Sequence, residues 1–69
     1  MNTIQKELAS RKTEIQGAVE LFFKSNMKIT DWDVPEADDT EAAKMLLDII
    51  QEKLDTIRDD VLAGRYKNY

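Results

Sequence analysis

The chain has 69 residues, a net charge of −4, and neither cysteine nor histidine. A single core of this size rarely supplies more than about 3–5 kcal/mol of net stability, so small folds rely on disulfides, metals or oligomerisation. The composition excludes disulfides, thiolate and imidazole ligands and the usual general base. The two glycines, Gly17 and Gly64, stand too far apart for a phosphate-binding loop. We therefore expect one domain, residues 1–69, that is not an enzyme, has no cofactor and is completed by oligomerisation.

Charge is distributed unevenly along the chain. Residues 1–28 contain five Lys/Arg and three Glu, whereas residues 29–64 contain three Lys/Arg and eleven Asp/Glu. A protein that binds duplex nucleic acid normally has a basic face, so we expect no direct nucleic-acid binding. No apolar run approaches the roughly 18 residues needed to cross a bilayer, and the N-terminus lacks the apolar region of a signal peptide. These features predict a cytoplasmic protein without membrane contact.

The first predicted element is a helix over about residues 3–25. Its apolar positions follow a heptad spacing if Arg11 occupies the one missing position; they are Ile4, Leu8, Ile15, Ala18 and Phe22. Asn2 and Gln5 have the spacing of a capping box at its start. Asn26 suits the left-handed residue that often follows the end of a helix.

A connection is predicted over residues 26–38, and its length favours a loop that is packed against the helices. Two capping-box patterns compete for the start of the next helix: Asp33-Val34-Pro35-Glu36 and Asp38-Asp39-Thr40-Glu41. We expect the first pattern to give only a short extra helical turn at 34–38. The long helix is then predicted to begin at about residue 39.

The second helix is predicted over about residues 39–63, with Gly64 as its cap and a short tail at 64–69. Its heptad positions are Ala43, Leu47, Ile50, Leu54, Ile57 and Val61. Leu46, Ile49 and Met45 widen this stripe beyond what one neighbouring helix covers. The predicted oligomer interface consists of Leu46, Leu47, Ile49, Ile50, Leu54, Ile57 and Val61.

Together these elements predict an all-α fold, an antiparallel two-helix hairpin that assembles into a homo-oligomeric helical bundle. A homodimer would form a four-helix bundle, and a larger assembly of closed symmetry is the alternative.

An acidic segment is the main candidate for binding a different protein. It comprises Asp31, Asp33, Glu36, Asp38, Asp39 and Glu41, together with the aromatic Trp32. Two interpretations remain open: an anionic surface for a basic partner, or helix capping and compensation of the helix dipole. A calcium loop starting at Asp31 is excluded because its sixth residue is Glu36 instead of glycine, and its twelfth is Ala42 instead of glutamate.

The function predicted from these features is that of a small acidic interaction protein, a regulator or adaptor that binds another protein. One alternative is an inhibitor whose acidic face imitates nucleic-acid phosphates and occupies a basic groove. A second alternative is a structural subunit of a larger assembly.

Overall fold

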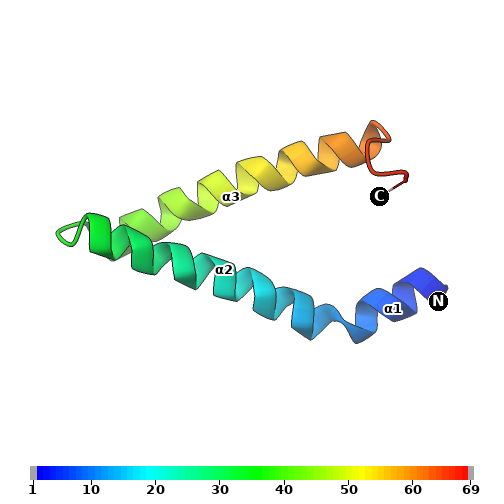
Figure 1. Cartoon of the computed structure of the whole chain (residues 1–69), viewed down its shortest axis with the longest axis horizontal. Helices are drawn as coiled ribbons and strands as arrows, with labels where there is room; N and C mark the ends of the chain where they lie inside the picture. Colours follow the sequence, from blue (N-terminus) through cyan, green and yellow to red (C-terminus); the bar gives the residue numbers. More distant parts are fainter. Residues whose placement is uncertain (1, 69) are drawn as a thin grey trace.

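The computed structural model describes residues 2–68, which form three helices and no strand: α1 (Thr3–Ser10), α2 (Lys12–Asp33) and α3 (Asp39–Leu62). Figure 1 shows α2 and α3 leaving a short connection as the two arms of a V, with α1 extending from the far end of α2 at an angle. We call the connection and the adjoining helix turns the closed end, and the end with α1 and the last turns of α3 the open end. The all-helical class is confirmed. Met1 and Tyr69, the last residue of the predicted tail, lie outside the described residues.

The helix predicted over residues 3–25 is divided at Arg11, whose φ of −102° and ψ of 4° are not helical. The Ser10 hydroxyl donates to the Glu7 carbonyl oxygen at 2.8 Å. In an α-helix this carbonyl would accept the Arg11 N–H, which instead bonds to the Leu8 oxygen at 3.2 Å. Competition of this kind between side chain and backbone bends helices. The prediction of one continuous first helix is therefore wrong.

Helix α2 continues to Asp33, well past the predicted end at residue 25. Asn26 is not a left-handed residue after the helix, since no described residue other than glycine has a positive φ. Its side-chain amide donates to the Phe22 carbonyl at 2.9 Å, and its own carbonyl accepts the Thr30 hydroxyl at 2.9 Å. Asn26, Met27 and Thr30 are half-buried on one helix face. We attribute the longer helix to packing of this face, which local propensity does not reveal.

The connection spans only residues 34–38 and contains a single turn, closed by a hydrogen bond of 3.0 Å from the Ala37 N–H to the Val34 oxygen. Val34 leaves the helical region, with φ −136° and ψ 73°. The ring of Pro35 disfavours helical geometry at the preceding residue, which explains why α2 ends here. The extra helical turn predicted at 34–38 does not form, and the connection is shorter than expected.

Both ends of α3 are fixed by local chemistry. The Asp38 carboxylate accepts the Thr40 N–H at 2.8 Å and the Glu41 N–H at 3.3 Å, which confirms the predicted start at Asp39. At the other end Gly64 has a φ of 82°.

Gly64 forms a Schellman motif with its neighbours. Its N–H donates to the Val61 oxygen, and the Arg65 N–H donates to the Asp60 oxygen, both at 3.0 Å. The Arg65 guanidinium also lies 3.6 Å from the Asp60 carboxylate. The prediction that Gly64 stops the helix is confirmed.

No side chain in residues 2–68 is buried. The half-buried residues are Phe23, Asn26, Met27, Thr30, Ala37, Ala42, Ala43, Leu46, Ile50, Ile57, Asp60 and Gly64. The molecule measures 49 × 27 × 17 Å, and its radius of gyration is 15.9 Å, against about 11 Å for a compact domain of this length. The described chain by itself therefore has no closed hydrophobic core.

Candidate functional site

The two arms contact each other mainly at the closed end. There Phe23, Met27 and Thr30 of α2 are half-buried, as are Ala42, Leu46 and Ile50 of α3. Small side chains at the start of α3 permit a close approach of the backbones, and Figure 1 shows the arms diverging from this point. Packing at the closed end therefore fixes the V and leaves the inner faces of both arms accessible.

A central groove of about 540 Å³ lies between the arms where they begin to diverge. It is lined by Ala18, Val19 and Phe22 of α2 and by Ile49, Ile50, Lys53, Leu54 and Ile57 of α3. Val19 and Phe22 are each 56% exposed and Leu54 is 51% exposed. Lys53 can lay its aliphatic stem along the groove while its ammonium group stays in water. The central groove is thus an apolar surface that this chain does not cover.

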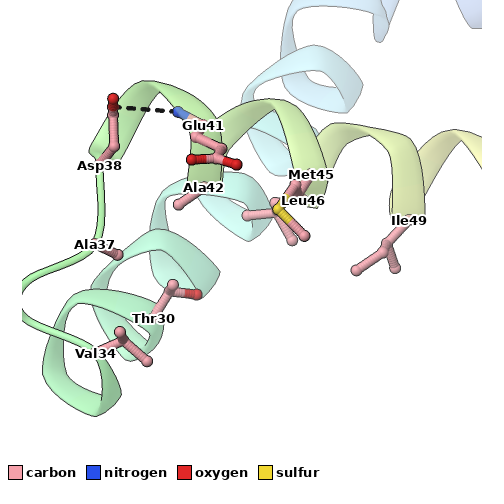
Figure 2. A pocket seen from close by; sticks show the side chains of 9 residues that line it. All are labelled: Thr30, Val34, Ala37, Asp38, Glu41, Ala42, Met45, Leu46 and Ile49. Carbon is pink, nitrogen blue, oxygen red and sulfur yellow. Dashed lines mark hydrogen bonds between the residues drawn. The ribbon is translucent and has the colours of Figure 1, made fainter.

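An apical groove of about 480 Å³ opens beside the connection, and its wall is mostly aliphatic. It is lined by Thr30, Val34, Ala37, Asp38, Glu41, Ala42, Met45, Leu46 and Ile49. Figure 2 shows Met45, Leu46 and Ile49 projecting from α3 to one side, where Thr30 and Val34 face them, with Asp38 and Glu41 near the start of the helix. Because Ile49 lines both grooves, the apical and central grooves form one continuous apolar strip.

The structure distributes the predicted interface residues over this strip unequally. Ile49, Ile50, Leu54 and Ile57 line the central groove, and Leu46 lines the apical groove.

Two other members of the predicted interface lie elsewhere. Val61 lines a groove of about 460 Å³ further along α3, together with Gln51, Leu54, Asp55, Ile57 and Arg58. Leu47 lines none of these three grooves and is 52% exposed. The face of α3 turned toward α2 is centred on the half-buried Leu46 and Ile50, whereas the heptad pattern predicts Leu47 and Ile50. Leu46 and Leu47 point about 100° apart around the helix axis.

Thr30, Val34 and Ala37 line the apical groove although none of them belongs to a site predicted from the sequence. Thr30 falls in the connection predicted from the sequence but belongs to α2, whereas Val34 and Ala37 lie in the connection, whose position beside α3 no residue spacing indicates. A stripe at positions 23, 27, 30 and 34 has the spacing of a helix face and could have been recognised.

The acidic segment divides into two groups. Asp38 caps α3, and Asp39 and Glu41 lie in its first turn, where carboxylates stabilise the positive end of the helix dipole. The capping interpretation therefore explains these three residues.

The other acids have no such role in the described chain, because the pattern from Asp33 to Glu36 does not begin a helix. Asp31, Asp33 and Glu36 are exposed, and Trp32 between them is 89% exposed. We call these four exposed residues the acidic–aromatic patch.

Asp31 and Asp39 bring two carboxyl groups together across the closed end. A hydrogen bond with Asp39 raises the pKa of Asp31 above its ordinary value, and desolvation and the like charge of Asp39 act in the same direction. Such a pair favours a shared proton or a nearby cationic group.

Within residues 2–68, no three carboxylates are grouped so that they could hold a metal ion, and none of the helices is long and apolar enough to cross a membrane. A scan against protein-family models and searches of curated proteins and of solved structures found no match to this chain.

Proposed function

We propose that this chain is a small, acidic, non-enzymatic interaction protein that pairs with a second copy of itself and, as a regulator or adaptor, binds another protein. The observation that carries the proposal is the apolar strip. Monomeric soluble proteins rarely expose large contiguous apolar patches, and those that occur mark interaction sites. Here Val19, Phe22 and Leu54 are more than half exposed along one groove.

The accessible surface supports a self-interface. The chain exposes 6466 Å², whereas a compact monomer of this mass exposes about 4,400 Å². The difference is about 2,000 Å² per copy, and stable obligate dimers bury roughly 2,000–5,000 Å² in total. Two copies that each covered the other's inner faces would therefore bury an area sufficient for a stable dimer.

The arms are suited to a helical bundle. Two V-shaped chains related by a two-fold axis would bring four long helices together, with the central groove of each copy facing the other. Four-helix bundles pack their helices about 20° from antiparallel around apolar positions of heptad type. In this assembly α2 and α3 form the helical hairpin that the sequence predicts, and Ile50, Leu54 and Ile57 enter a shared core.

Binding of a different protein is assigned to the acidic–aromatic patch. Tryptophan is enriched among residues that dominate binding energy at interfaces, and Trp32 stands among carboxylates that cap no helix. A partner with a basic rim around an apolar pocket would neutralise Asp31 and Asp33 and bury the indole ring. None of the four residues of this patch lines the apical groove or the central groove.

Leu54→Asp tests the self-interface because this side chain lines the central groove. We expect the variant to lose the dimer, since pairing would bury a charge in an apolar interface. The measurement is mass by light scattering over a range of concentrations, with helicity followed by circular dichroism. Leu62→Asp is the control, because Leu62 is 81% exposed and lies outside the central groove. A folded Leu54→Asp variant with the mass of the unchanged dimer would contradict the proposal.

Trp32 is the only tryptophan and reports on the acidic–aromatic patch. We expect its fluorescence to remain that of a solvent-exposed indole, equally quenched by acrylamide at concentrations below and above dimer formation. The reason is that the patch remains outside the self-interface. A blue shift that accompanies dimer formation would place Trp32 in the self-interface and remove the patch as a site for another protein.

A further inference from the structure

We propose that the apical groove receives helix α1 of the second copy, so that the dimer is antiparallel: the closed end of each V lies against the open end of the other. This inference rests on the proposed dimer and adds its orientation. It assigns a binding partner to α1, a helix that projects from α2 at an angle and has no buried residue.

Helix α1 has the form of a docking segment. The break at Arg11 separates it from α2, and its eight residues make a helix about 12 Å long. Ile4 and Leu8, one turn apart, are 70% and 49% exposed. Within one chain α1 cannot reach the apical groove, because the two lie at opposite ends of a molecule 49 Å long (Figure 1). A second copy in antiparallel orientation brings them together.

Charge favours the same arrangement. Asp38 and Glu41 stand at the apical groove, whereas Arg11 and Lys12 follow directly after α1. Lys12 is the first residue of α2, directly after the break at Arg11 that separates it from α1. A dimer with both closed ends together would instead juxtapose two acidic segments, which carry six carboxylates each between residues 31 and 41. Like charges held together at an interface oppose association, so the parallel arrangement is disfavoured.

Shape and symmetry also agree with this orientation. The closed end is narrow and the open end is wide (Figure 1). The shared residue Ile49 makes the apical groove continuous with the central groove, so one antiparallel partner can cover both. Two-fold symmetry then repeats the contact, each α1 in the other's groove, and closes the assembly at two copies.

Engineered disulfides test the orientation directly, because the chain has no cysteine of its own. Leu8→Cys protein is mixed with Met45→Cys protein, reduced, and then allowed to oxidise. We expect mixed disulfide-linked dimers to form several-fold faster than with Leu47→Cys as the partner. Leu47 is a matched control: it is 52% exposed against 59% for Met45 and lies two residues away, but does not line the apical groove.

The alternative outcomes are distinct. Equal rates with Met45→Cys and Leu47→Cys, or fastest cross-linking of Met45→Cys to itself, would overturn the antiparallel orientation. Light scattering of the reduced mixture separates the two proposals. A dimer without the expected cross-link overturns only the orientation, whereas a monomer overturns both the orientation and the self-pairing on which it rests.

Charge exchange provides a second measurement that does not depend on cysteine chemistry. Glu41→Lys and Lys12→Glu are each expected to raise the dissociation constant of the dimer about two- to fivefold. The double variant should recover most of the affinity, because the opposite charges again face each other. Glu52→Lys, on a part of α3 outside the grooves, controls for the change in net charge. A double variant as weak as the two single effects combined would overturn the proposed contact.

Discussion

The closed and open ends of the V have apolar side chains in the same helical pattern but give them different surroundings. Near the connection, Phe23, Met27 and Leu46 are half-buried because the opposite helix lies against them. Further along α3, Val61 and Leu62 are 53% and 81% exposed because the arms have diverged. The spacing of apolar residues makes a helix amphipathic, whereas burial of those side chains requires another helix packed against them.

We expect the two ends to depend on assembly to different degrees. Isolated helices shorter than about 12–15 residues are marginal in water, and most helical stability in proteins comes from packing of an apolar face. The closed end has some of this packing within one chain. The eight residues of α1 and the last turns of α3 have little of it, so their order should depend more strongly on a second copy.

The largest expected effect comes from placing a charge at the closed end. Leu46→Asp should lower the free energy of unfolding by about 2 kcal/mol or more, because it removes an apolar contact and desolvates a carboxylate. Urea unfolding followed by circular dichroism measures the change. Leu62→Asp, at the open end, should stay within about 0.5 kcal/mol of the unchanged protein. Equal losses from the two variants would contradict the distinction between the ends.

A smaller and oppositely signed pair of effects is expected at the two glycines. Gly64→Ala should cost about 1–2 kcal/mol because Gly64 has a φ of 82°, which alanine adopts at a cost. The added Cβ would lie 3.2 Å from Cε of Lys67, a flexible side chain that can move.

Gly17→Ala is the matched variant. Nothing lies within 4 Å of the added Cβ, and the position is inside α2, so it should stabilise the helix by about 1 kcal/mol. Thermal unfolding of both variants measures the two signs. A loss of stability in Gly17→Ala would mean that another helix approaches Gly17 closely in the assembled protein.

The smallest effect concerns pH. Because the pKa of Asp31 is raised in the folded chain by its hydrogen bond with Asp39, folding favours its protonated form. This contribution to stability is complete below the ordinary pKa of 3.8 and is lost as pH rises through the raised value. Asp39→Asn should remove that part of the pH dependence, measured by urea unfolding across mildly acidic pH, whereas Glu36→Gln should leave it in place. A pH dependence unchanged in Asp39→Asn would contradict the coupling.

Features set by neighbouring residues were predictable. The capping box of Asn2 and Gln5 forms as expected, with side-chain to backbone distances of 2.8 and 3.0 Å. The start of α3 after Asp38 and its end before Gly64 were predicted for the same reason: each depends on hydrogen bonds within a few residues. The break at Arg11 is not predictable from the sequence, because the bond from Ser10 to Glu7 is one of several that a serine can make.

The residues of the candidate surface were predicted only in part. The heptad pattern identified Ile50, Leu54 and Ile57, which line the central groove. It could not show that Thr30 and Val34 complete an apical groove with Leu46, since that depends on how far α2 extends and where α3 lies beside it.

The sequence by itself determined the helical class, the ends of α3 and the excess of apolar surface over what one neighbouring helix can cover. Capping bonds, glycine conformation and residue spacing are local properties, and they act in any chain with these residues. Only the tertiary structure decided that the arms meet at Leu46 and Ile50 and diverge beyond them, leaving a continuous groove. The physical reason is that burial is a property of pairs of surfaces, and one amphipathic helix does not specify the position of the other.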